Sequence, residues 1–274
     1  MTDPTAYSIL IPLAPWEPVQ QVRETLASIE QQTLAPSQVV VSCDGTPTAA
    51  LSELLLHSSL PLLMVHGPGK EGVGPVLNRG LQRCREELVL RVDADDICMP
   101  ERSEIQVAAM LQRPELMALS TPVLEFLESS QSPLHSRITP MGSRSIRKHS
   151  KWRNPMNHPA VILRKTKILE LGGYRDCPGF EDYDLWLRIL KRGDFLDNLS
   201  LPLVKARIGS GHLARRHGMG YLRKEWAFLW GCGRIRTLSW PRVALLILLR
   251  TPIRIAPSSY QQWLTKHLLR RGPQ

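Results

Sequence analysis

The chain has 274 residues, of which 43% are hydrophobic, and it carries a formal net charge of +10. No apolar run is long enough for a transmembrane helix, no basic and apolar leader predicts a secretory signal, and the five scattered cysteines form no disulfide or zinc pattern. We therefore expect a reduced, cytosolic protein with one principal α/β domain and an appendage.

The basic residues are concentrated at the C-terminal end. Residues 205–274 contain 14 Lys and Arg against one acid, a net charge of +13, whereas residues 1–204 contain 21 against 24 acids, or −3. The same end carries many aromatic and aliphatic side chains, among them Trp226, Trp230, Trp240, Leu245 and Leu248. This mixture favours an anionic membrane surface over nucleic acid as partner, with a solvated charged face as the alternative.

Apolar patterns predict alternating strands and helices through the first hundred residues. We expect strands at 9–11, 39–41, 62–65 and 88–92, and helices at 19–32, 51–56 and 76–85. Strands separated by helices imply right-handed crossovers and a mainly parallel sheet flanked by helices. Ligands bind such sheets outside the carboxyl ends of the strands, where Asp44, Asp93 and Asp95 are expected.

The last of these strands runs into a cluster of acids. Leu88 to Val92 is apolar except for Arg91 and is followed by Asp93, Asp95 and Asp96. Clustered carboxylates at a strand end repel one another and are stabilised by a cation, and hard oxygen ligands select Mg²⁺ or Mn²⁺. The alternative is an acidic surface turn, in which Asp96 would be a solvent-facing residue or a cap.

A later helix begins with acids. Leu185, Trp186 and Ile189 make one apolar stripe, so a helix is predicted to run to about Arg192 and to stop at Gly193. Glu181 and Asp182 then lie in its first turn, where acids commonly stabilise the helix dipole. Asp184 and Arg188 have the spacing of an ion pair on one helix face.

A series of motifs runs in order along the chain, at 8–12, 28–33, 43–46, 72–80, 91–96, 100–102, 157–161, 172–174 and 181–186. Together they resemble the inverting family 2 glycosyltransferases of the GT-A fold, and in particular those of amylovoran and capsular exopolysaccharide biosynthesis. The resemblance covers nearly all of residues 7–205. It implies a catalytic GT-A domain at 1–205 and a basic, mainly helical extension at 206–274.

The resemblance also implies roles for individual residues. Asp95 and Asp93 match the two acids of a D-x-D motif that holds Mn²⁺ or Mg²⁺ on the donor diphosphate, and Asp182 matches the general base, with Glu181 orienting. Contacts with the nucleotide sugar are implied for Pro12, Asp44, Lys70, Asn78, Arg79, Asp93, Ala94 and His158.

The chain departs from the family pattern at two positions, and it does not show clearly whether a late histidine completes the metal site. Cys43 stands where a first acid is usual, and Lys70 stands where an asparagine is usual; Lys70 could approach phosphate or extend into water. Some relatives complete the metal shell with a late histidine, for which His212 and His217 are candidates. Arg215 and Arg216 could cover a diphosphate.

The predicted function is transfer of a hexose from a nucleotide-diphosphate sugar, expected to be a UDP-sugar, to a lipid-linked saccharide in polysaccharide, capsule or lipopolysaccharide biosynthesis. The enzyme would lie peripherally on the cytoplasmic face of the inner membrane. One alternative is a nucleotidyltransferase of similar fold, which should carry a basic loop after the first strand, whereas this chain has Leu13-Ala-Pro-Trp-Glu17. Another is a non-catalytic module that binds nucleic acid or membrane through the basic end. The sequence does not fix the oligomeric state.

Overall fold

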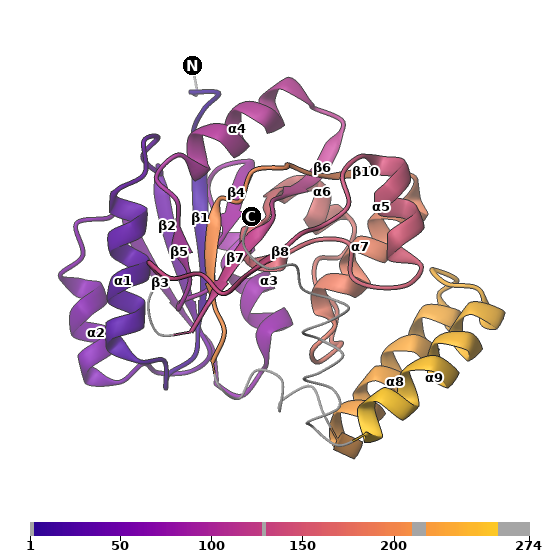
Figure 1. Cartoon of the computed structure of the whole chain (residues 1–274). Coiled ribbons are helices and arrows are strands. Elements are labelled where there is room, and N and C mark those ends of the chain that lie inside the picture. The colour runs from indigo at the N-terminus through magenta and orange to yellow at the C-terminus, as the bar shows by residue number, and fades with distance from the viewer. Residues whose placement is uncertain (1–2, 128–129, 210–217, 257–274) are drawn as a thin grey trace.

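The computed structural model describes residues 3–127, 130–209 and 218–256. Its centre is a seven-stranded sheet of order β10-β6-β9-β4-β1-β2-β3 (Figure 1). The strands are β1 (Tyr7–Leu13), β2 (Gln38–Cys43), β3 (Leu62–His66), β4 (Leu88–Arg91), β6 (Leu116–Ser120), β9 (Ile162–Arg164) and β10 (Phe195–Asn198). Only β9 runs antiparallel to its neighbours, so the predicted mainly parallel α/β fold is confirmed.

Helices cover both faces of this sheet. They are α1 (Val19–Glu30), α2 (Ala49–Leu56), α3 (Val73–Arg83), α4 (Arg102–Gln112), α5 (Ser143–Ser150), α6 (Lys165–Glu170) and α7 (Glu181–Arg192). The pleat of β1 sends Ile9 and Ile11 into the core under α1, α2 and α4, whereas Leu10 joins the core under α3, α6 and α7. The sheet is therefore buried on both sides, which explains why its strands are continuous apolar runs.

The expected helices are present with shifted ends. α3 begins at Val73, three residues before the expected start, because Gly72 adopts a φ of 84° at its N-cap. Gly80 then lets α3 lie close to the sheet, since a Cβ there would come within 2.3 Å of Leu10 Cδ1. α7 ends as predicted at Arg192, with Gly193 in the left-handed region at φ 97°.

A second, four-stranded sheet of order β5-β11-β7-β8 lies beside the carboxyl end of β4. It contains β5 (Ile97–Cys98), β7 (Val123–Phe126), β8 (His135–Arg137) and β11 (Val204–Arg207). β5 follows the acidic cluster directly, and β11 pairs with both β5 and β7. This sheet therefore fixes the loop that carries the acids.

Two antiparallel helices, α8 (Gly218–Arg234) and α9 (Trp240–Ile255), form a hairpin at one end of the molecule (Figure 1). The hairpin packs on α7 through a separate apolar cluster in which Phe180 stacks on Phe228 at 4.7 Å and Tyr183 lies 5.2 Å from the same ring. Within the described residues no helix is long and apolar enough to cross a membrane.

Candidate active site

A side chain of α1 fixes the loop after β4 by hydrogen bonds to its backbone. Thr25 Oγ1 lies 2.9 Å from the carbonyl oxygen of Ala94 and 2.8 Å from that of Asp96. Ala94 is buried, so its role is to shape the loop while Asp93 and Asp95 on either side are only partly buried. Asp93 and Asp95 are therefore the more accessible residues of this turn, whereas Ala94 packs into the core.

Asp93 is already paired within the protein. Arg91, which is 4% exposed although it lies in β4, donates from both terminal nitrogens to the two carboxylate oxygens of Asp93, with Nη1 2.6 Å from Oδ2. This bidentate contact neutralises Asp93 and fixes its orientation. Arg91 is the polar break in the otherwise apolar strand, and the sequence had given no partner for it.

The negative charges of Asp95 and Asp96 are not balanced by a bidentate cation of the kind that pairs with Asp93. Burial, followed by repulsion from Asp93 and Glu17, raises the pKa of Asp95 to about 6. Burial, followed by repulsion from Asp93 and Asp95, raises the pKa of Asp96 well above its ordinary value. Asp96 is 3% exposed and its Oδ1 accepts the backbone N–H of Arg207 at 2.8 Å, so the alternative in which it is a solvent-facing turn residue is wrong.

This charge distribution suits a divalent cation. Carboxylates that burial and mutual repulsion push toward protonation gain stability when a cation binds beside them. Within the described part of the chain, no group of three or more His, Cys, Asp or Glu side chains is arranged to hold a metal by itself. Asp93 and Asp95 could hold Mg²⁺ or Mn²⁺ together with substrate phosphate oxygens, since Mg²⁺ is usually bound through one or two carboxylates and phosphate.

A second acidic loop follows β2 at the same edge of the sheet. Asp44 accepts the backbone N–H of Glu71 at 3.0 Å, and Gly45 and Gly69 approach so closely that a Cβ on Gly45 would lie 3.2 Å from Gly69 Cα. Lys70, between these contacts, is exposed and adopts a φ of 59°. Asp44 thus joins the loop after β2 to the loop before α3, and we call the surface made by these two loops the wall. Lys70 extends from it into solvent.

Arg79 completes this wall. Its Nη1 donates to Glu71 and its Nη2 donates to the carbonyl oxygen of Cys43 at 2.8 Å. The Cys43 side chain is 1% exposed in the core, and burial raises its pKa to about 11, so it is a neutral packing residue. Pro12, on the adjoining strand, is partly buried and lies in register with Ser42.

Asn78 joins α3 to the segment before α7. Its amide oxygen accepts the backbone N–H of Tyr174 at 2.8 Å, and its amide nitrogen donates to the Tyr174 carbonyl at 2.7 Å. Gly74 keeps the two segments close, because a Cβ there would lie 3.2 Å from the Arg175 carbonyl oxygen and 3.5 Å from Glu181 Cγ. The glycine loop and the start of α7 are therefore neighbours.

The first turn of α7 carries the predicted base. Asp182 is partly buried, and Asn154 Nδ2 donates to its Oδ2 at 2.5 Å. Glu181 points back toward its own loop, where Oε2 accepts the Gly179 N–H at 3.0 Å, and burial is the main cause that raises its pKa. The predicted ion pair on this helix is confirmed, with Arg188 Nε 2.7 Å from Asp184 Oδ2.

His158 and Tyr174 bridge the two acidic regions. His158 Nε2 lies 2.9 Å from the Tyr174 hydroxyl, and the ring also packs at the edge of Trp186. Burial, and then the charge of Arg91, lowers the pKa of His158 well below its ordinary value, so this imidazole is neutral at pH 7. Burial raises the pKa of Tyr174, which lies within electrostatic range of both Arg91 and Asp182.

The structure thus links most of the expected residues by hydrogen bonds and short-range charge interactions, and adds several to which the sequence analysis gave no role in the site. The added residues are Glu17, Asn154, Tyr174 and Arg207. Arg207, whose Nε donates to the Asp95 carbonyl at 3.1 Å and whose Nη2 donates to Glu24 at 2.6 Å, is distant in sequence from its partners. His212, His217, Arg215 and Arg216 lie outside the described residues.

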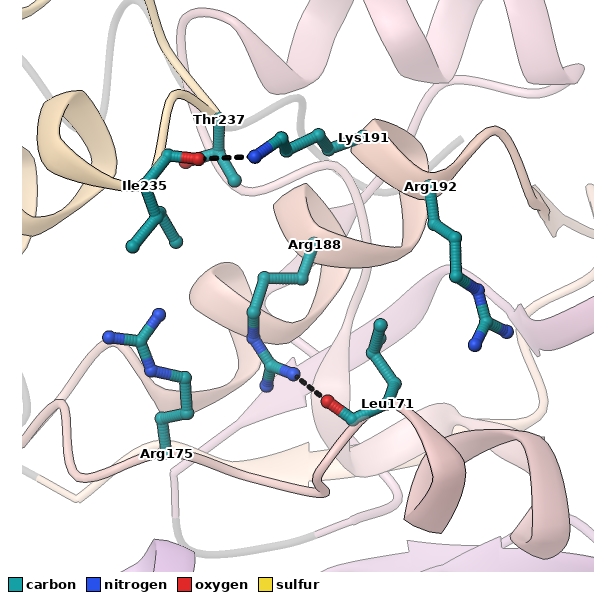
Figure 2. A pocket seen from close by; sticks show the side chains of 7 residues that line it. All are labelled: Leu171, Arg175, Arg188, Lys191, Arg192, Ile235 and Thr237. Atoms are coloured by element: carbon teal, nitrogen blue, oxygen red, sulfur yellow. Dashed lines mark hydrogen bonds between the residues drawn. The ribbon is translucent and has the colours of Figure 1, made fainter.

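A separate cavity of about 450 Å³ lies on the outer side of α7, lined by Leu171, Arg175, Arg188, Lys191, Arg192, Ile235 and Thr237 (Figure 2). Its cationic groups are largely engaged by the protein: Arg188 contacts Asp184 and the Leu171 carbonyl, and Lys191 donates to the Ile235 carbonyl at 2.5 Å. None of the predicted site residues lines it.

The sequence and the structure were compared with those of known proteins, and both comparisons find glycosyltransferases. The sequence profile described as glycosyl transferase family 2 matches residues 16–172, more than half of the chain, and the chain belongs to this family. Solved glycosyltransferases share the fold. The mannosyltransferase PcManGT from Pyrobaculum calidifontis, in complex with GDP-Man and Mn²⁺, is similar over 97% of this chain and 81% of that chain, with a TM-score of 0.61 and 18% identity. TarS 1-349 from S. aureus, in complex with UDP-GlcNAc, is similar over 83% of this chain and 66% of that chain, with a TM-score of 0.60 and 18% identity.

Curated relatives of similar sequence include glycosyltransferases of bacterial polysaccharide biosynthesis. The amylovoran biosynthesis glycosyltransferase AmsE from Erwinia amylovora is 34% identical over 94% of this chain and 97% of its own length. An Escherichia coli UDP-Gal:alpha-D-GlcNAc-diphosphoundecaprenol beta-1,3-galactosyltransferase is 32% identical over 99% of both chains. The protein is therefore a family 2 glycosyltransferase of GT-A fold, related along most of its length to enzymes of bacterial polysaccharide biosynthesis.

Proposed function

We propose that this protein is an inverting hexosyltransferase that moves a sugar from a UDP-hexose to a saccharide carried on a lipid diphosphate. The observation that supports this most is the position of Tyr174, which lies within electrostatic range of both Arg91, the partner of Asp93, and Asp182, the partner of Asn154. An acid cluster suited to a cation and a separate oriented carboxylate are the two groups that such a transfer requires.

In this mechanism Asp182 Oδ accepts the proton of the acceptor hydroxyl, whose oxygen then forms a bond to the anomeric carbon of the donor. The bond between that carbon and the diphosphate oxygen breaks as the new bond forms, and the nucleoside diphosphate leaves with the electron pair. Attack from the face opposite the leaving group inverts the configuration, and a single carboxylate base suffices. Asn154 holds Asp182 in place, and Glu181 supports the loop that precedes it.

Asp95, with Asp93 beside it, would hold Mn²⁺ or Mg²⁺, which supplies positive charge for the leaving diphosphate. Arg91 orients Asp93 through its bidentate contact, and Thr25 and Arg207 hold the intervening backbone. The wall formed by Asp44, Glu71 and Arg79 would face the nucleotide. Pro12, Lys70, Asn78 and His158 would contribute to the same surface, and the buried Ala94 would shape the loop beside it.

The proposed classes of donor and acceptor are inferred from what similar proteins bind or act on. The name of one relative specifies UDP-Gal as donor and a sugar on diphosphoundecaprenol as acceptor. The two solved structures of similar fold hold UDP-GlcNAc and GDP-Man, so they do not choose between the nucleotides. Because that enzyme and this chain are similar along 99% of each, a UDP-hexose and a lipid-linked acceptor are the first substrates to test.

The test uses the full-length protein with a panel of UDP- and GDP-hexoses, with Mn²⁺ or with EDTA, and measures release of nucleoside diphosphate. We expect one UDP-sugar to be turned over with metal, loss of turnover with EDTA, and loss with Asp95→Ala. Transfer to a synthetic diphosphate lipid carrying N-acetylglucosamine should accelerate that turnover. Release that EDTA and Asp95→Ala leave unchanged would contradict the proposed metal site.

A further inference from the structure

The α8–α9 hairpin has a long apolar helix face that none of the other described residues covers. In α9, Leu245, Leu248, Leu249 and Ile255 are exposed. Leu248 and Leu249 follow Leu245 by three and four residues, and Ile255 follows Leu248 by seven, so all four lie on one helix face. The opposite face of α9 supplies Val243 and Leu246 to the buried cluster with α8. A helix that is apolar both toward its partner and toward solvent has an outer face available for another apolar phase.

Exposed tryptophans extend this face onto α8. Trp226 Nε1 donates to Thr251 Oγ1 at 3.0 Å, and the rings of Trp230 and Trp240 meet edge to face at 4.8 Å. All three tryptophans are exposed. We call the surface made by Trp226, Trp230, Trp240, Leu245, Leu248, Leu249 and Ile255 the hairpin face.

The charges around the hairpin face are positive. Within the described hairpin, residues 218–256, the one acid is Glu225, which is 1% exposed and contacts Arg250 and Arg254. The exposed charged side chains of this segment are therefore basic, namely Arg223, Lys224, Arg234 and Arg236. An apolar face with tryptophans, bordered by cations and without exposed acids, has the chemistry of a helix that lies in a membrane interface.

We propose that the hairpin face docks this enzyme on a bilayer that contains anionic phospholipid, with the tryptophans and leucines at the acyl boundary and the basic side chains at the headgroups. The positive border favours this occupant over a second copy of the chain, since apposed hairpins would bring like charges together. Docking there would hold the enzyme against the phase that carries a lipid-linked acceptor, but it is a property of the hairpin and stands apart from the catalytic proposal.

The test is flotation of the full-length protein with vesicles of phosphatidylcholine, with or without about 30% phosphatidylglycerol. Wild type should bind the anionic vesicles, and raising the salt from about 0.1 to about 0.5 M should weaken binding severalfold. Leu248→Glu should lower the partition coefficient at least about tenfold, because it replaces an inserted leucine with a charge. Leu56→Glu is a matched control, because Leu56 on α2 and Leu248 are both 70% exposed, and it should bind as wild type.

Donor hydrolysis in solution separates this proposal from the proposed function, since both variants should retain the wild-type rate. The proposal is overturned if wild type fails to bind anionic vesicles, or if Leu248→Glu binds them as wild type does. It is also overturned if light scattering shows a wild-type dimer that Leu248→Glu dissociates while vesicle binding is absent, because the hairpin face would then be a contact between copies.

Discussion

Asn154 Nδ2 donates to the Asp182 carboxylate at 2.5 Å, which joins the loop after α5 to the first turn of α7. The second oxygen of Asp182 accepts the backbone N–H of Tyr183 at 2.7 Å. Two donors thus fix the rotation of this carboxylate, and so the direction from which it can accept a proton.

Replacing Asn154 should therefore impair turnover more than substrate binding. We expect Asn154→Ala to lower kcat about 10- to 100-fold with KM for the donor changed less than about threefold, since the loss falls on the orientation of the base. Steady-state kinetics would measure this, with Arg153→Ala at the exposed neighbouring position as the control. An unchanged kcat would show that the Asn154 contact has no part in catalysis.

The raised pKa of Asp95 predicts a gain in stability on neutralisation. Because the folded-state pKa is about 6 against an ordinary 3.8, ionised Asp95 destabilises the metal-free protein above about pH 4. Asp95→Asn should raise the free energy of unfolding by roughly 1–2 kcal/mol at pH 7.5 in EDTA, and the gain should shrink as pH falls through 6 and vanish near pH 4. Urea titrations at several pH values would measure it. A constant gain across this range would mean that the carboxylate charge is not its cause.

Arg91 should stabilise the folded protein because it pairs with the Asp93 carboxylate. Arg91→Leu leaves the Asp93 carboxylate without its bidentate partner, and we expect a loss of about 2–3 kcal/mol in unfolding free energy, moderated because the Asp93 side chain is 33% exposed. The double variant Arg91→Leu/Asp93→Ser should recover part of this loss. Equal stability of the single and double variants would show that the unpaired charge is not responsible.

Gly80 offers a packing test with an internal control. Gly80→Ala would place a Cβ 2.3 Å from Leu10 Cδ1 and 2.9 Å from Ser42 Cβ, so it should destabilise the protein by about 1–3 kcal/mol. Gly231→Ala, in α8 with nothing within 4 Å, should stabilise by about 0.5–1 kcal/mol. Thermal unfolding of the two variants would check both signs, and a stabilised Gly80→Ala would contradict the close contact between α3 and β1.

The parts of the fold that local patterns encode were predictable. The apolar run at Leu88 to Val92 became β4, and the stripe through Leu185 and Ile189 became α7, which ends before Gly193 as expected. These signals depend on residues within one or two turns of each other. The parallel sheet followed from the alternation of such elements, and so did the expected edge for Asp44 and Asp93.

What the sequence could not supply depends on contacts between distant segments. Asp96 is buried because Arg207, 111 positions later, covers it with a backbone N–H, and Asn154 meets Asp182 across 28 positions. The antiparallel insertion of β9 between β4 and β6 has no local signature either. The partner of Arg91 was only two residues away, and a charged residue inside an apolar strand is the signal that could have indicated a buried ion pair.

The most direct test of the central claim is the single-turnover rate of Asp182→Asn with saturating UDP-sugar, Mn²⁺ and a lipid diphosphate saccharide, beside its donor affinity. We predict donor binding within about threefold of wild type and a transfer rate lower by a factor of about a hundred or more, because the substitution removes the proton acceptor and retains the shape. Transfer at the wild-type rate would show that Asp182 is not the base.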